Sequence, residues 1–105
     1  MNEQDYCNYV SDRFFQFFKE SRIIKQHVPG KMAAWQIVFK LKSYKVYVSA
    51  EKGFLDFHVI TGNDNDLGLF SKNPKLFNDQ FYTNKKNIDI IINFLYDHKD
   101  EIFVD

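Results

Sequence analysis

The sequence predicts an α+β fold with an N-terminal helix, a three-stranded antiparallel meander, a long loop and a C-terminal helix packed on one face of the sheet. Three observations support this prediction. Apolar residues recur at helical spacing near both ends of the chain, they alternate with polar residues in the middle, and a lysine-glycine pair separates two alternating runs. Helices and half-buried strands produce these two periods.

Length and composition indicate one folded domain spanning residues 1–105. A chain of 105 residues has the common size of a single domain. Its hydrophobic share is 45% and its aromatic share 18%, with twelve phenylalanines. This apolar surface is enough to form a core, so we expect an ordered chain.

The first helix is expected from Asn2 to about Ser21. Asn2 has the side chain of an N-cap residue, and Asp5 three positions later approximates a capping box. The apolar residues cover about half of the helix circumference, more than the ~100° stripe that core packing requires. Either two layers of the fold cover this arc or part of it is exposed. The arc consists of Tyr6, Cys7, Val10, Phe14, Phe15, Phe17 and Phe18.

The helical pattern ends at His27-Val28-Pro29-Gly30, because proline disfavours helix at the preceding residue and Pro-Gly is typical of turns. Strands are expected next, over residues 35–42, 45–51 and 54–61. In the first of them, every second residue is large and apolar, which is the period of a half-buried strand. These residues are Trp35, Ile37, Phe39 and Leu41.

The second and third strands are predicted to form a hairpin through a two-residue turn at Lys52-Gly53, where glycine accommodates a positive φ. This register separates the two faces of the hairpin, and a slip by one residue would mix them. On the core face, Ala50, Val48 and Val46 lie opposite Leu55, Phe57 and Val59. On the other face, Ser49, Tyr47 and Lys45 lie opposite Asp56, His58 and Ile60.

Residues 62–82 show no sustained period and are interpreted as a long, partly ordered loop with an acidic cluster at Asn63-Asp64-Asn65-Asp66. Loops of this length are uncommon, so a short strand or helical turn near residues 77–81 is the alternative. A last helix is predicted over residues 83–101. Its buried face is marked by Ile88, Ile91, Ile92 and Leu95.

The formal net charge is zero, yet the charges are distributed unevenly along the chain. Residues 1–18 have one base and three acids, residues 19–52 have eight bases and two acids, and residues 53–105 have five bases and nine acids. A surface with both signs suits a protein partner that carries both signs as well. A general nucleic-acid binder usually has a clear basic excess.

Cysteine usage and the lack of targeting patterns predict a cytoplasmic protein. Cys7 is the only cysteine, so no intramolecular disulfide forms, which is typical of a reducing compartment. The first residues lack the basic and apolar regions of a signal peptide, and no segment approaches the ~18 apolar residues that span a membrane.

We expect no enzymatic activity, no cofactor and no metal site. His27, His58 and His98 are too scattered for a local metal motif, and Cys7 falls on the apolar arc of the first helix, where a buried, inert thiol is expected. Nucleophile and base often meet only in the folded protein. A cleft that joins Cys7 to a histidine would therefore overturn this expectation.

The sequence does not fit a calcium loop of the EF-hand type, although Asp64-Asn65-Asp66 offers alternating oxygen ligands. Counted from Asp64, position 5 is Gly68 where an Asp or Asn is required. Position 12 is Lys75 where the bidentate Glu should stand. A solvated turn is the better interpretation.

The predicted partner-binding residues are Tyr47, Asp56, His58, Asp64 and Asp66. In the hairpin register, the first three lie together on the solvent side of the sheet. A tyrosine, an acid and a titratable donor suit recognition, since tyrosine offers a large contact area at low entropic cost. An ordinary exposed sheet surface is the alternative.

A small RNA- or DNA-binding module is the alternative function. Lys40, Lys42 and Lys45 lie around the first hairpin with Tyr44 and Tyr47 between them, a pattern that suits phosphate contacts and base stacking. The zero net charge and the absence of RNP-like and Gly-x-x-Gly sequences argue against nucleic-acid binding.

The order of elements, the aromatic segment Phe14-Phe15-Gln16-Phe17-Phe18, the Lys-Gly hairpin and the isoleucine-rich last helix resemble bacterial toxin-immunity proteins of contact-dependent inhibition and related polymorphic toxin systems. The resemblance implies a cytoplasmic binder that neutralises one cognate toxin domain, commonly a nuclease, by occluding its active site. Many immunity proteins that oppose basic nucleases are acidic, and this neutral chain departs from that pattern. An adaptor or a homodimer is the third hypothesis.

Overall fold

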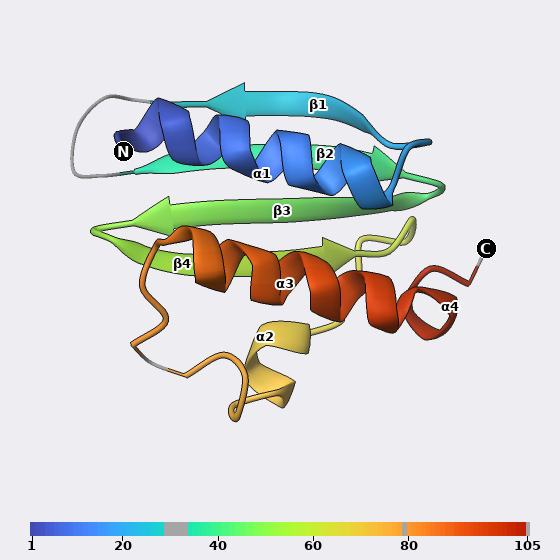
Figure 1. The fold of residues 1–105 in the computed structure, drawn as a ribbon. Helices are drawn as coiled ribbons and strands as arrows, with labels where there is room; N and C mark the ends of the chain where they lie inside the picture. The colour runs from blue at the N-terminus through green and yellow to red at the C-terminus, as the bar shows by residue number, and fades with distance from the viewer. Residues whose placement is uncertain (29–33, 79, 105) are drawn as a thin grey trace.

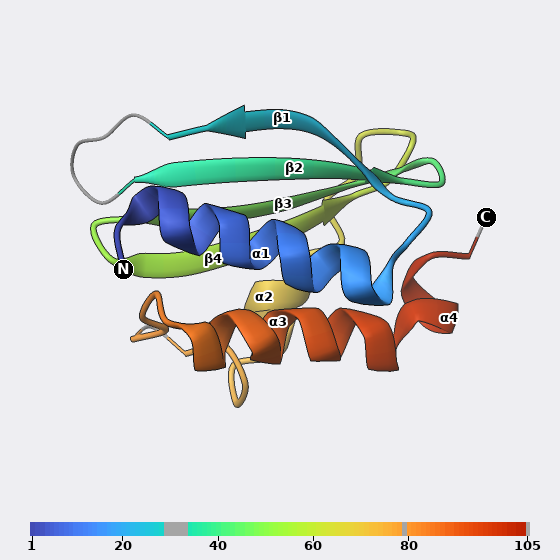
Figure 2. The same cartoon turned by 45° about the horizontal axis from the view of Figure 1, so that its top comes forward.

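The computed structural model describes residues 1–28, 34–78 and 80–104. It is an α+β fold with one four-stranded antiparallel sheet in the order β1-β2-β3-β4. Helices α1 and α3 lie side by side across the same face of this sheet (Figures 1 and 2). The elements are α1 (Glu3–Phe17), β1 (Arg22–His27), β2 (Trp35–Leu41), β3 (Tyr44–Glu51), β4 (Phe54–Ile60), α2 (Leu69–Lys72), α3 (Lys85–Asp97) and α4 (Lys99–Ile102).

The predicted capping box of α1 is confirmed. The backbone N–H of Asp5 donates to Asn2 Oδ1 at 2.9 Å, and the backbone N–H of Asn2 donates to the Asp5 carboxylate at 3.1 Å. The helix ends at Phe17 rather than near Ser21. Its apolar arc is shared between two layers, because Phe14 stacks on Phe39 of the sheet with ring centroids 4.0 Å apart, while Phe17 packs against Tyr96 of α3.

The predicted three-stranded sheet is wrong, because β1 adds a fourth strand. All six residues of β1 are exposed, so the strand shows no alternation of buried and exposed positions. Its pairing with β2 also shifts between Ile23 and Lys25, and a bulge of this kind breaks the period of two. The predicted turn at Pro29-Gly30 lies outside the described residues.

The predicted hairpin register is confirmed at every position. Tyr47 pairs with His58, Val48 with Phe57 and Ser49 with Asp56, and Phe57 is fully buried. Both turn residues have a positive φ, 53° at Lys52 and 83° at Gly53, as a two-residue turn between twisted strands requires.

The segment 62–82 is not a featureless loop, because it contains the short helix α2 and borders β4. The backbone N–H of Leu67 donates to the carbonyl of Val59 at 3.0 Å, and that of Leu55 donates to the carbonyl of Phe81 at 2.8 Å. The helical turn lies at residues 69–72 rather than near residues 77–81. Four helical residues are too few to show a period in the sequence.

The last predicted helix is divided in two, since α3 ends at Asp97 and α4 begins at Lys99, with His98 between them. Asn84 caps α3 by accepting from the backbone N–H of Asn87 at 2.7 Å. The predicted buried face is confirmed, and it packs with α1 and the inner face of the sheet into one hydrophobic core. That face comprises Ile88, Ile91, Ile92 and Leu95.

Candidate functional site

The sheet face opposite α1 and α3, here called the open face, carries the candidate site. Neither of these helices covers it, as the tilted view shows (Figure 2). Strand alternation sends Val46, Val48 and Phe57 into the core and leaves Tyr47 and His58 on the open face as a directly opposed pair. The hairpin register therefore positions two of the predicted partner-binding residues.

His58 lies between two carboxylates on this face. Its Nδ1 is 2.8 Å from Asp66 Oδ2, and its Nε2 is 3.1 Å from Asp56 Oδ2. All three side chains are 44% exposed. A neutral imidazole carries one N–H, so the imidazolium is the form that donates to both carboxylates. We call Asp56, His58 and Asp66 the His58 cluster.

Backbone contacts hold the two acids of the His58 cluster in place. Asp56 Oδ1 accepts from the backbone N–H of Phe57 at 2.7 Å, and Asp66 Oδ1 accepts from that of Gly68 at 2.8 Å. Asp66 is brought to the sheet by its bridge with Ile60 at the end of β4. Each carboxylate thus uses one oxygen for the backbone and the other for His58.

The structure brings four of the five predicted residues together. The His58 cluster accounts for three, and Tyr47 lies directly opposite His58 on β3. Asp64 lies two residues before Asp66, exposed in the turn with a φ of 63°. Aspartate tolerates this left-handed conformation better than most residues.

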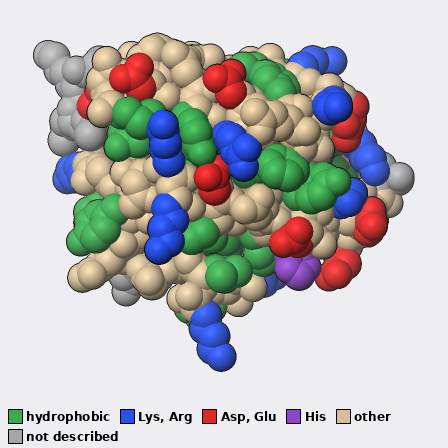
Figure 3. Space-filling model, in the orientation of Figure 1, with side chains coloured by type: hydrophobic (Ala, Val, Ile, Leu, Met, Phe, Trp, Pro, Cys, Tyr) green, Lys and Arg blue, Asp and Glu red, His purple; other side chains and the backbone are tan. Residues whose placement is uncertain are grey.

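Basic residues occupy the other side of the open face. Lys40 on β2 pairs with Lys45 on β3 and with Arg22 on β1, and Lys25 on β1 pairs with Val38. The charge separation along the chain therefore persists in space, with basic side chains toward β1 and acidic ones at β4 and the following turn. On the helix side, Figure 3 shows both signs interspersed with hydrophobic side chains.

The aromatic strip expected for nucleic-acid binding is only partly present. Tyr44 is buried, packs its ring 5.3 Å from that of Phe103, and its hydroxyl accepts from the backbone N–H of Val104 at 3.3 Å. Lys42 Nζ donates to the carbonyl of Phe103 at 3.0 Å. Tyr44 is in phase with the inward residues of β3, so Tyr47 is the tyrosine of this pair that reaches the open face.

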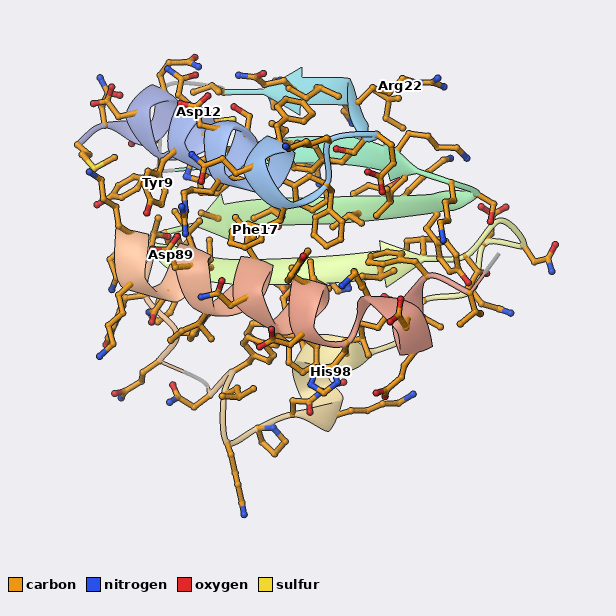
Figure 4. The ribbon with its side chains drawn as sticks, turned by 45° about the vertical axis from the view of Figure 1, so that its right-hand side comes forward. Tyr9, Asp12, Phe17, Arg22, Asp89 and His98 are labelled. Carbon is orange, nitrogen blue, oxygen red and sulfur yellow. The ribbon has the colours of Figure 1, made fainter. Side chains whose placement is uncertain are left out.

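Cys7 is fully buried within α1. Burial raises the pKa of its thiol, and a hydrogen bond with the side chain of Gln26 acts weakly in the opposite direction. Such a thiol is protonated and unreactive at neutral pH. His98 lies at the far end of α3, 3.7 Å from Glu101 and against the Phe94 ring (Figure 4). Within residues 1–28, 34–78 and 80–104, no group of three or more His, Cys, Asp or Glu side chains is arranged to hold a metal ion.

A cluster between the two long helices was not predicted. The Tyr9 hydroxyl donates to the Asp89 carboxylate, with oxygen distances of 2.9 and 3.0 Å, and Arg13 Nε donates to the same group at 2.9 Å. Figure 4 shows Tyr9 and Asp89 directed toward each other from α1 and α3. Burial, followed by the hydrogen bond to Asp89, raises the pKa of Tyr9. Eighty positions separate these residues, so no local pattern indicates the contact.

A hollow of about 280 Å³ lies near the C-terminal ends of α1 and α3, with Phe17, Tyr96 and Lys99 among its lining residues. Its volume is below the roughly 300–1,000 Å³ of pockets that enclose a small molecule. A small-molecule site here is therefore not favoured over the open face.

In the part of the chain that the structure describes, no helix is long and apolar enough to cross a membrane. Comparisons with protein-family models, with curated protein sequences and with solved structures found no match.

Proposed function

We propose that this protein is an immunity protein, a stoichiometric inhibitor that binds a cognate bacterial toxin domain through its open face and occludes the toxin's active site. The observation that carries the proposal is the His58 cluster at the acidic side of an open, dipolar sheet face. The resemblance of the sequence to toxin-immunity proteins points in the same direction. The toxin is proposed to act on RNA or DNA.

Charge complementarity explains how this surface would inhibit. A toxin that cleaves RNA or DNA needs cations in its cleft to bind phosphate. Carboxylates from Asp56, Asp64 and Asp66 would occupy those positions, exclude the substrate and accelerate the encounter. Tyr47 beside them adds contact area at low entropic cost.

The first test removes the acidic charges while preserving the turn. Asn retains an amide oxygen for the backbone contact of Asp66 and tolerates the positive φ of Asp64. The double variant Asp64→Asn/Asp66→Asn should bind the co-encoded toxin about tenfold more slowly and protect co-expressing cells poorly. The matched control is Asp97→Asn/Asp100→Asn, which removes the same charge from exposed positions at α3 and α4.

Two outcomes separate the function from the surface. If no toxin encoded beside this gene binds the purified protein, the proposed function is wrong. If a toxin binds and both double variants associate as fast as the unmodified protein, the function stands and the proposed surface is wrong.

One observation favours nucleic-acid binding as a second candidate. Lys40 and Lys45 are directly opposed on the open face, and like charges in this position are destabilising. An anionic ligand would relieve that repulsion. A gel shift with a generic single-stranded RNA tests this function, since phosphate contacts make the affinity fall steeply with salt.

A further inference from the structure

The two edges of the sheet differ in how their backbone groups are used. The outer edge of β4 is covered by the chain that follows it. Leu55 and Leu67 contribute two of the bonds already described, and the backbone N–H of Thr83 donates to the carbonyl of Gly53 at 2.8 Å. Isolated bridges also join β4 to Asp66 and Tyr82. This edge therefore has little capacity for another strand.

The β1 edge is open. β1 ends the strand order, and all six of its residues are exposed. Among the residues that the structure describes, its backbone pairs with β2 on one side, and no backbone hydrogen bond is formed on the other. Figure 1 shows β1 at the border of the sheet with no labelled element beyond it. Unpaired N–H and C=O groups along such a strand are a template for a further strand.

The side chains of β1 indicate which strand would fit. Pairing with β2 puts Arg22, Lys25 and His27 on the open face. Figure 4 shows Arg22 projecting outward from this border. Ile23 is 37% exposed and Ile24 44% exposed. The edge therefore offers two cations beside apolar surface.

A second copy of this chain is a poor occupant of the edge. Antiparallel pairing of β1 with itself would gather two Arg22 and two Lys25 side chains along one seam, and like charges across strands are destabilising. The same cations favour a strand that carries carboxylates. The bulge between Ile23 and Lys25 further limits unspecific pairing.

We propose that the β1 edge binds an extended, acidic segment of a partner protein, which adds a fifth strand to the sheet. Main-chain hydrogen bonds provide the affinity in this mode, and alternate side chains provide the selectivity. Naming that partner as the toxin rests on the proposed function. Four inter-strand spacings separate the new strand from β4, which carries Asp56 and His58, a distance of about 19 Å. One partner with a basic cleft and a neighbouring acidic strand would contact both the His58 cluster and the β1 edge.

The test uses a synthetic peptide of about ten residues that alternates glutamate with valine, which is the pattern of an amphipathic strand. Amide resonances and hydrogen exchange of the full chain are followed by NMR during the titration. The β1 amides should shift and their exchange should slow. A control peptide with lysine in place of glutamate should bind about tenfold more weakly.

Charge reversal on the protein gives the matched pair of variants. Lys25→Glu should weaken binding of the glutamate peptide about tenfold and strengthen that of the lysine peptide. Lys86→Glu, at an exposed position on α3, should change neither. Unchanged amide spectra away from each substituted residue would show that both variants are folded.

Several results would overturn the edge proposal. These are peptide-induced shifts confined to the helices or β4, equal binding of both peptides, or binding of an RNA oligonucleotide at β1 in place of the peptide. With a co-encoded toxin, Lys25→Glu separates the two proposals. If the toxin binds Lys25→Glu as tightly as the unmodified protein, the edge proposal is wrong and the proposed function stands. If the peptide binds at β1 but no co-encoded toxin binds the protein, the proposed function is wrong and the edge proposal stands.

Discussion

Neighbouring residues of β4 have different roles. Phe57 is in the core, while Asp56 and His58 belong to the His58 cluster on the open face. The site and the core therefore depend on the same register. A change that shifts the strand by one residue would bury the cluster and expose Phe57. Substitutions on the two faces should consequently affect different properties.

Phe57→Ala should lower the free energy of unfolding by about 3–5 kcal/mol, because it removes a buried ring and leaves a cavity. The ring packs against those of Phe70 and Phe77, with centroids 5.9 and 4.9 Å apart. Urea denaturation measures the change. Phe54→Ala is the control on the same strand, where the ring is 44% exposed and stacks on Tyr82. Equal losses for the two variants would contradict the assigned core.

Tyr9→Phe should lower the free energy of unfolding by about 1 kcal/mol at neutral pH, because it removes the hydrogen bond to the Asp89 carboxylate. The substitution should also make the free energy of unfolding decline less steeply above about pH 10. The folded protein raises the pKa of Tyr9 above its ordinary value. The associated stability is therefore fully present below about pH 10 and is lost as the pH rises through the raised value.

Urea denaturation at about pH 7.5 and about pH 10.5 tests the alkaline effect. Burial also raises the pKa of the Cys7 thiol. The free energy of unfolding of Tyr9→Phe is therefore still expected to decline at high pH, but less steeply than that of the unmodified protein. Parallel declines in the variant and the unmodified protein would show that Tyr9 does not contribute to the pH dependence.

Among the elements, predictability followed burial. β3 and β4 alternate between more and less buried residues, and β2 does so except at Val38, which is also buried, so their period and register were evident in the sequence. β1 is exposed throughout and has no period, although its two adjacent isoleucines have high strand propensity. No periodic pattern in the sequence therefore indicated the strand that leaves the sheet with an open edge.

The candidate site was predictable to the extent that it depends on the hairpin. Tyr47, Asp56 and His58 share a face by register alone. The contact between His58 and Asp66 arises because the chain returns beside β4 and forms a bridge at Ile60. That return is set by tertiary packing of residues 62–82, which leaves no periodic signal.

Lys52→Asn should stabilise the hairpin by about 0.5–1 kcal/mol, because asparagine adopts a positive φ more readily than lysine. The backbone at Lys52 has a φ of 53°. Lys42 in the preceding turn has a similar φ of 54° and also donates to the Phe103 carbonyl. Lys42→Asn should therefore raise the free energy of unfolding less, because it also removes the contact with Phe103. Thermal or urea denaturation of the two variants checks the order, and a larger gain at Lys42 would contradict this account.

At the scale of the whole molecule, zero net charge is combined with separated charges on one face. Basic residues of β1, β2 and β3 lie toward one border of the open face, and the His58 cluster lies toward the other. Among the described residues, one ion pair joins α1 to another element, Arg13 with Asp89 at 2.9 Å. Salt should therefore act differently on folding and on association.

The free energy of unfolding should change little between about 50 mM and about 500 mM NaCl, because partly exposed ion pairs contribute little to stability. Over the same range, the association rate with a co-encoded toxin should fall about tenfold or more, since salt screens the complementary fields that steer the encounter. Denaturant titrations and stopped-flow association measure the two quantities on the same protein. If the association rate is constant with salt while the complex still forms, shape and apolar contacts rather than the dipolar open face direct the encounter.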